Sequence, residues 1–233
     1  MKIKASLHLH AKEDIRDCKL IDYTIKDLID RAAVLNFKVL AITCHEKMVC
    51  NSEMVAYAKS RGILLIPGVE IRLNRKDLLI LNCDVTAEQI TDFALLDKWR
   101  QKHPESFIIV PHPNHGMMVS LGLNKLRRHR DLFDAVEHSW FYSKQFDPNR
   151  KVSRICVALN KPFVATSDLH QLKYLDLDYA VLELADLTPS AVFAAIREGK
   201  FQNVSQPKSI LELAIFYIWM STKNFIALFT PDE

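Results

Sequence analysis

Short apolar runs alternate with longer amphipathic segments over most of the chain. Runs of this kind, bounded by turn residues, are typical of strands buried in a sheet. The segments between them are long enough for helices, so the pattern predicts repeated strand–helix units. The strands predicted in this way cover residues 3–9, 39–43, 63–66, 78–82, 107–111, 135–137, 163–166 and 179–184.

Helix start signals lie between several of these runs. Thr24, with Asp27 three residues on, predicts an N-cap. Thr86 and Gln89 predict a capping box at the start of the next helix. Thr188 precedes a proline, which favours the first turn of a further helix. Alternation repeated about seven times predicts a parallel β/α architecture.

Polar side chains occur repeatedly where the predicted strands end. In an open doubly wound sheet, ligands gather at a single switch point. In a barrel, the strand ends converge on one mouth from all around the ring. Because the polar positions follow many strands rather than two, the pattern favours a barrel. These positions are His8, His10, Cys44, His45, Glu70, His112, Glu137, Asp168 and His170.

His8 and His10 give the first chemical signal. Side chains alternate along a strand, so residues two apart share a face and both imidazoles can reach one ion. One such pair is a weak signal, but five of the nine histidines follow an apolar run, the others being His45, His112 and His170. Scattered surface histidines would not produce that repetition, so the histidines predict a metal site.

Carboxylates extend this pattern. Glu70 follows a strand and a glycine, and a carboxylate with two oxygens can bridge two cations. Asp168 and His170 again stand two residues apart. His112 lies between two prolines, which predicts an extended, restricted backbone suited to a preorganised ligand.

Composition narrows the partners and the compartment. With 31 basic and 28 acidic residues the net charge is only +3, which does not indicate a nucleic-acid or membrane-surface binder. Five irregularly spaced cysteines and an N-terminus without an apolar signal segment predict a cytoplasmic protein. We expect a single domain, 1–233, with 207–229 forming a C-terminal helix packed on the barrel. Membrane-surface contact through Phe216, Trp219 and Phe225 is the alternative.

Five motifs occur in order along the chain: Leu7-His8-Leu9-His10, Ile42-Thr43-Cys44-His45, Pro67-Gly68-Val69-Glu70, Pro111-His112-Pro113 and Ser167-Asp168-Leu169-His170. Together they resemble the polymerase and histidinol phosphatase (PHP) superfamily, up to about residue 185. The resemblance implies an α/β fold, a distorted (β/α)7 TIM-like barrel, with a metal site at the C-terminal ends of the strands. It also implies hydrolysis of phosphate esters with two or three divalent metal ions (Mn, Fe or Zn).

The resemblance implies roles for individual residues. Asp17 competes with Asp14 for one ligand position, and spacing favours Asp14. Glu70 and Asp168 are the implied catalytic residues. Beside the resemblance, His115 is a basic residue three positions after His112, and we expect it to act with them by helping to hold phosphate. The implied metal ligands are His8, His10, Asp14, His45, Glu70, Asp77, His112, Asp168 and His170.

The chain departs from the family pattern at three positions. Ser6 stands where an aspartate is common, and Cys44 replaces another aspartate. Asp77 is the best match to a histidine ligand that family members carry after the bridging glutamate. We expect Cys44 to be a small, half-buried residue beside the site, and the metal position near Asp77 to be the weakest.

The implied reaction is attack on phosphorus by a hydroxide that bridges two cations. The expected partner is a small phosphorylated substrate, including a nucleotide or a short oligonucleotide. Other basic candidates for phosphate contact are Lys12, Arg16 and Arg72. The aromatic run Trp140-Phe141-Tyr142 either lines the mouth or packs in the core. The alternatives are a non-catalytic module that binds metal or a phosphorylated ligand, and another metal-dependent barrel hydrolase. The absence of a lysine at a strand end disfavours the latter.

Overall fold

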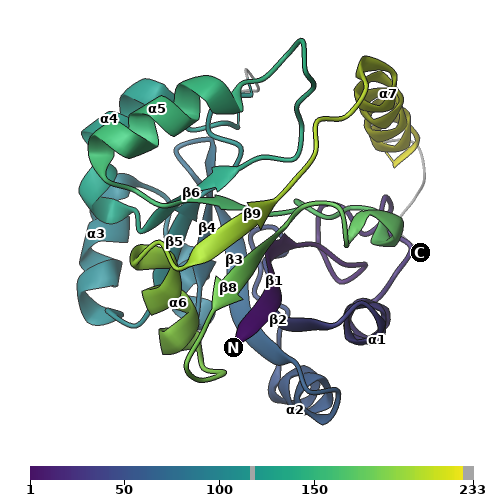
Figure 1. Ribbon diagram of the computed structural model, residues 1–233, viewed down its shortest axis with the longest axis horizontal. Helices are drawn as coiled ribbons and strands as arrows, with labels where there is room; N and C mark the ends of the chain where they lie inside the picture. The colour runs from purple at the N-terminus through teal and green to yellow at the C-terminus, as the bar shows by residue number, and fades with distance from the viewer. Residues whose placement is uncertain (116–118, 228–233) are drawn as a thin grey trace.

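The computed structural model describes residues 1–115 and 119–227, which form one curved sheet surrounded by helices (Figure 1). The strands are β1 (Lys2–Leu9), β2 (Phe37–Ile42), β3 (Leu64–Leu73), β4 (Lys76–Leu81), β5 (Phe107–Val110), β6 (Ala135–His138), β7 (Phe163–Ala165), β8 (Tyr179–Glu183) and β9 (Phe201–Val204). The α-helices are α1 (Ile25–Val34), α2 (Ser52–Ser60), α3 (Phe93–Lys102), α4 (Leu123–Arg128), α5 (Asn149–Leu159), α6 (Pro189–Arg197) and α7 (Ile210–Ala227). Three short 3₁₀ helices are η1 (Val85–Gln89), η2 (Arg130–Leu132) and η3 (Leu172–Tyr174).

The strands lie in the order β7-β6-β5-β4-β3-β2-β1-β8-β9. Four neighbouring pairs are antiparallel, namely β3–β4, β4–β5, β1–β8 and β8–β9, and the others are parallel. The described residues therefore do not make seven uniform strand–helix repeats. One cause lies between β3 and β4, where Asn74 and Arg75 have φ angles of 48° and 64°. Two consecutive left-handed residues make a tight hairpin, so β4 returns beside β3 without an intervening helix.

A side chain closes the sheet into a ring. The amide of Asn203 on β9 donates to the carbonyl of Phe163 and accepts from the backbone N–H of Ala165, both at 2.8 Å, on β7. An asparagine side chain offers N–H donors and a carbonyl acceptor, as the backbone does, so it substitutes for a backbone pair between the edge strands. The predicted TIM-like barrel is thus confirmed as a class.

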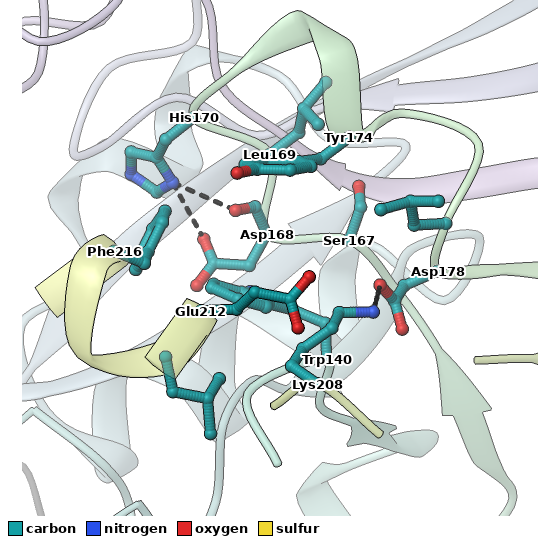
Figure 2. Close-up of a pocket in the computed structure, with 12 residues that line it drawn as sticks. Trp140, Ser167, Asp168, Leu169, His170, Tyr174, Asp178, Lys208, Glu212 and Phe216 are labelled. Atoms are coloured by element: carbon teal, nitrogen blue, oxygen red, sulfur yellow. Dashed lines mark hydrogen bonds and ion pairs between the residues drawn. The ribbon is translucent and has the colours of Figure 1, made fainter. Parts of the chain in front are cut away.

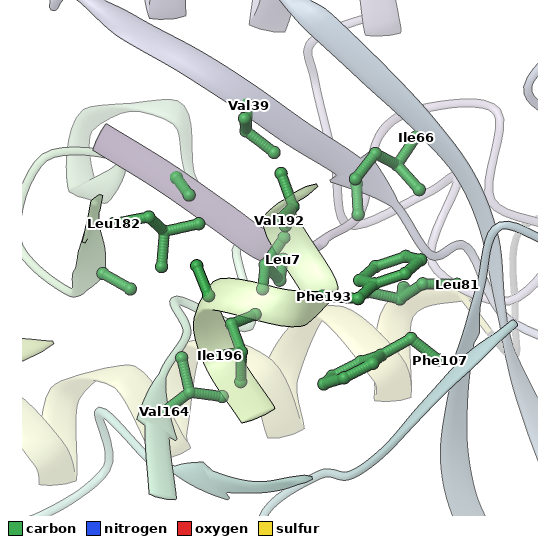
Figure 3. Close-up of a cluster of buried hydrophobic side chains, with 14 of the residues drawn as sticks. Leu7, Val39, Ile66, Leu81, Phe107, Val164, Leu182, Val192, Phe193 and Ile196 are labelled. Carbon is green, nitrogen blue, oxygen red and sulfur yellow. The ribbon is translucent and has the colours of Figure 1, made fainter. Parts of the chain in front are cut away.

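The barrel is filled by apolar side chains from the strands and from α6 (Figure 3). Phe107 on β5 stacks on Phe193 of α6, with ring centroids 4.7 Å apart. Because β8 runs antiparallel to β1, its C-terminal end and the following α6 lie at the N-terminal end of β1. The helix therefore seals the end of the barrel opposite to the C-terminal ends of β1 and β2.

The outer surface of the sheet is covered by the remaining helices. The buried residues of α1 pack on β2, and those of α3 to α5 pack on β3 to β6. The expected N-cap at Thr24 is confirmed, with a complete capping box to Asp27. The expected capping box at Thr86 is wrong, because Asp84 caps η1 and Asp92 caps α3. An aspartate two residues before Thr86 accepts its N–H at 2.9 Å, which starts the turn earlier.

Helix α7 packs on the rest of the structure through part of its surface. Leu213 is buried, and the Phe216 ring lies 4.6 Å from that of Trp140, edge to face. The helix begins at Ile210, after a reciprocal cap between Ser209 and Glu212. Residues 228–229 of the expected helix and the side chain of Phe225 lie outside the described residues. Among the described helices, none has the length and apolar character needed to cross a membrane.

Candidate metal centre

The predicted ligands meet at one mouth of the barrel. They lie at or after the C-terminal ends of β1, β2, β5 and β7, within β3 (Glu70) and at the start of β4 (Asp77). Backbone pairing sets part of this arrangement. The N–H of Leu169 donates to the carbonyl of His8, and the N–H of His10 donates to the carbonyl of Leu169. This bridge places the residues on either side of Leu169 against β1, so Asp168 and His170 lie next to the first histidine pair.

The first cluster contains His8, His10 and Asp168. The Nε2 atoms of the two histidines are 3.1 Å apart, and each lies 3.4 Å from Oδ1 of Asp168. Ligand atoms bound at about 2.1 Å to one tetrahedral or octahedral ion lie roughly 3.0–3.4 Å from one another. The spacing of these atoms therefore fits the coordination shell of a single cation.

The second cluster lies around His45. Asp14 Oδ2 lies 2.9 Å from Nδ1 of His10 and 3.0 Å from Nδ1 of His45. Asp14 also accepts backbone N–H groups from Arg16, Asp17 and His45. Asp17 instead places Oδ2 2.9 Å from Nε2 of His170. Asp17 Oδ2 also lies 3.6 Å from Nδ1 of His45. Both competing aspartates thus lie in the centre, Asp14 nearest to His10 and His45 and Asp17 nearest to His170.

The third cluster contains Glu70, Asp77 and His112. Oε1 of Glu70 lies 3.3 Å from Nε2 of His112. Asp77 on β4 is also held by Arg72, whose Nε and Nη2 donate at 2.8 and 3.2 Å. Nδ1 of His112 is buried and has no hydrogen-bond partner among the residues described, so this cluster retains an unused polar atom.

The backbone at His112 differs from the expectation. Its φ angle is +28°, which is not the extended conformation that the following proline favours. The N–H of His112 donates to Oε1 of Glu137 at 3.1 Å, and its ring contacts Glu70. Asp168 is also left-handed, with a φ of +44°. Such conformations cost about 1–3 kcal/mol and persist where surrounding contacts impose them, as these contacts do at His112.

Glu137 is a site residue that the sequence reasoning did not assign. It is fully buried at the end of β6, and its Oε2 lies 2.8 Å from Nδ1 of His8. A carboxylate on Nδ1 fixes the ring so that Nε2 faces the centre. The signal in the sequence was its place at a strand end, but its contact with His8 spans 129 positions and no local pattern reveals it.

Glu137→Gln is expected to weaken Mn²⁺ binding by roughly 10- to 100-fold, because the amide no longer fixes the tautomer of His8. The dissociation constant measured by calorimetry checks this. Glu183→Gln, at an exposed position on β8, is the matched control and keeps the original affinity. Equal affinities in all three proteins would show that Glu137 does not position a ligand.

The buried carboxylates of the centre favour positive charge on the groups around them. Burial alone would raise the pKa of Glu70, but His45 and His8 hold it well below its usual range. Burial opposes protonation of His10 and His112, yet Asp14 raises the pKa of His10 to about 10 and Glu70 raises that of His112 to about 9. In the metal-free protein protons supply this positive charge, and divalent cations fit the same need.

This charge balance predicts a pH-dependent response to metal. Both histidines have folded-state pKa values above the value of about 6.5 in an unfolded chain. Their protonation therefore stabilises the metal-free fold fully below about pH 6.5, and this stability is lost as the pH rises toward 9 and 10. A cation needs neutral imidazoles, so the increase in Tm on adding Mn²⁺ is expected to be larger at about pH 8.5 than at about pH 6. Calorimetric scans with Mn²⁺ or EDTA test this, and a smaller increase at the higher pH would contradict it.

The other predicted residues are distributed around the centre. The ring of His115 lies 6.2 Å from that of His112, and burial together with His112 lowers its pKa to about 4. Arg16 pairs with Glu46. Cys44 is fully buried rather than half-buried, and burial raises the pKa of its thiol, because its side chain packs in the apolar layer beneath α1.

A pocket borders the centre on the side of α7 (Figure 2). Asp168 and His170 form one edge of it, and Trp140 lies in its wall. The alternative in which Trp140 lines the mouth is therefore confirmed. The sequence suggested for Phe216 only a contact with a membrane surface. Its position in the pocket wall depends on how α7 packs against the barrel, which the sequence pattern does not define.

The fold and these clusters define an α/β barrel protein with a candidate multinuclear metal centre. The PHP domain family model matches residues 6–182. The chain therefore belongs to the PHP domain family. None of the curated proteins matches the chain.

Several solved structures share the fold. A two-domain protein from Bacteroides vulgatus, described as containing a predicted PHP-like metal-dependent phosphoesterase, superposes with a TM-score of 0.63 at 13% identity over 88% of this chain. The chain spans 65% of that protein. PsfC from Pseudomonas syringae gives a TM-score of 0.60 at 13% identity, covering 97% of this chain and 99% of PsfC. The lesion-specific endonuclease PfuEndoQ from Pyrococcus furiosus gives 0.60 at 15% identity, covering 87% of this chain and 58% of the endonuclease.

Proposed function

We propose that the chain hydrolyses phosphate esters with two or three divalent cations, Mn, Fe or Zn, in this metal centre. The position of Glu70 carries the proposal. Its buried carboxylate places Oε2 3.2–3.4 Å from Nε2 atoms of three histidines and Oε1 3.3 Å from a fourth. A carboxylate whose two oxygens face different groups of ligands is suited to bridging two cations. The four histidines are His8, His10, His45 and His112.

The donor set fits this chemistry. Mixed imidazole and carboxylate ligands suit Mn²⁺, Fe²⁺ or Zn²⁺. When bound, such cations supply Lewis acidity, which activates water and stabilises negative charge on a phosphoryl group. The proposed ligands bordering these cations are His8, His10, Asp17, His45, Glu70, Asp77, His112, Asp168 and His170.

Carboxylates of the chain orient these ligands. Asp14 faces the Nδ1 atoms of His10 and His45 and already accepts three backbone N–H groups. We therefore propose that Asp14 positions the two rings and that Asp17, beside His170, is the ligand of the pair. The spacing in the sequence favoured Asp14 as the metal ligand. Spacing alone does not tell which histidine nitrogen a carboxylate faces, so the structure leads us to propose Asp17 instead.

His115 is the proposed phosphate contact. Its Nε2 is buried and lacks a hydrogen-bond partner in the described part of the chain. With its pKa lowered to about 4 by burial and by His112, the ring is neutral near pH 7. It would then donate one N–H to a phosphoryl oxygen, and would not serve as an acid that delivers a proton.

The decisive experiment combines metal content with turnover. The purified protein is analysed by mass spectrometry for Mn, Fe and Zn. It is then assayed with added Mn²⁺ on an aryl phosphate, sugar phosphates, nucleotides and short oligonucleotides, and in parallel on a set of amides. Metal-dependent release of phosphate supports the proposal. Bound metal with no turnover on any ester would favour the non-catalytic binding module, and turnover of amides alone would favour another barrel hydrolase.

We also propose a cytoplasmic setting. All five cysteines are free thiols, and three of them are buried in the core. A chain that leaves all its cysteines unpaired is typical of a reducing compartment.

A further inference from the structure

The pocket between the metal centre and α7 has a mainly apolar wall. Leu177, Leu213, Trp140 and Phe216 line it, and Asp168 stands at the edge shared with the centre. In Figure 2, Asp168 comes from the loop after β7, Trp140 from the segment after β6 and Phe216 from α7. A group attached to a phosphoryl bound at the centre would thus meet aromatic and aliphatic surface.

Contacts among the lining residues and with the neighbouring backbone hold this wall in place. Lys208 precedes α7, and its Nζ lies 2.7 Å from Oδ2 of Asp178. Its N–H donates to the carbonyl of Tyr142 at 2.8 Å. The Trp140 and Phe216 rings meet edge to face at 81°. Helix α7 is therefore held in place by Lys208, shortly before its first residue, and by Phe216 in its second turn.

The charges around the pocket limit what it can bind. Lys208 is the cation in its lining, and Asp178 already neutralises it. Glu212 adds negative charge, whereas the carboxylate of Asp168 faces the histidines of the centre. A second phosphate on this side would meet carboxylates without a free cation, whereas a flat uncharged ring would bury apolar surface against Trp140 and Phe216.

We propose that this pocket binds the alcohol portion of the substrate, and that the substrate is a phosphate monoester of an alcohol with a planar aromatic group. This inference rests on the proposed function. Trp140 and Phe216 are then specificity-determining residues. The same charges disfavour an oligonucleotide, whose further phosphates would have to pass the carboxylates.

Binding of two phosphonates to the Mn²⁺-loaded protein tests the inference, because their C–P bonds resist hydrolysis. (1-Naphthylmethyl)phosphonate is expected to bind about tenfold or more tightly than methylphosphonate, as measured by calorimetry. Trp140→Ala and Phe216→Ala should reduce this preference to less than about threefold. Ile218→Ala, at an exposed position on α7, is the control and should keep it.

The alanine variants could lose the preference because α7 is displaced. A second variant, which fills the pocket instead of removing its wall, tests the inference independently. Leu177→Trp narrows the pocket and leaves the contact between Trp140 and Phe216 intact, and it should also remove the preference. Equal binding of the two phosphonates by the unaltered protein, or a preference that survives Leu177→Trp, would overturn the inference. A different result would overturn the proposed function itself. In that case methylphosphonate binding would not depend on Mn²⁺, and neither ethyl phosphate nor 1-naphthyl phosphate would be hydrolysed.

Discussion

Glu70→Gln is expected to lower metal-dependent turnover of an aryl phosphate by roughly a thousandfold or more, with the fold retained. The glutamine has nearly the same shape but lacks the charge and the second acceptor oxygen needed to bridge two cations. It also leaves four histidines facing one another around a neutral group. We therefore expect Mn²⁺ binding to fall together with kcat.

The measurement is kcat/KM at saturating Mn²⁺, with the bound metal counted in the same samples and the fold checked by circular dichroism. Glu183→Gln, exposed and paired with Lys2, is the control and keeps full activity. A Glu70→Gln protein that turns over substrate within about tenfold of the unaltered chain would contradict the placement of this residue at the reacting centre.

Phe107→Ala is expected to lower the free energy of unfolding by about 3–5 kcal/mol. The side chain is fully buried inside the barrel, stacked on Phe193, and the Arg197 guanidinium lies 5.0 Å from its ring centre. Truncation leaves a cavity between the strands and α6, which neither can fill without moving. For a chain of this size, Tm falls by roughly 2–4 °C per kcal/mol.

Urea unfolding at fixed Mn²⁺ concentration measures this effect, because bound metal would otherwise change the apparent stability. The matched control is Phe146→Ala, in which a phenylalanine with 52% of its surface exposed is truncated. It should cost less than about 1 kcal/mol. Similar losses in the two variants would contradict the assignment of Phe107 to the barrel interior.

The class of fold and the location of the centre followed from the sequence, because both depend on local periodicity. Strand alternation puts His8 and His10 on one face, and the later strand ends repeat the same residue types. A barrel is what allows those ends to meet. The structure brings them together with Glu70 among the four histidines.

The remaining features depend on contacts between distant positions. Glu137 reaches His8 across 129 positions, and Asn203 reaches β7 across about 40. The β3–β4 hairpin was missed because Asn74 and Arg75 are not the Asn-Gly pair that usually marks such a turn. In the sequence, nothing distinguishes Trp140 and Phe216 from other aromatic residues. They come into contact only because α7 packs against the segment after β6.

Two hydrogen bonds of the Asn203 side chain join the two edge strands of the sheet and so close the barrel. Elsewhere the ring is joined by backbone ladders, but between β7 and β9 a single side-chain amide supplies the two hydrogen bonds. Without them, the carbonyl of Phe163 and the N–H of Ala165 at the edge of β7 would lose these partners, and unpaired groups at a strand edge can pair with other chains. The same strand, β7, leads directly into Asp168 and His170. One uncharged side chain thus pairs the edge backbone groups of β7 and holds in place the strand that leads to two of the proposed ligands.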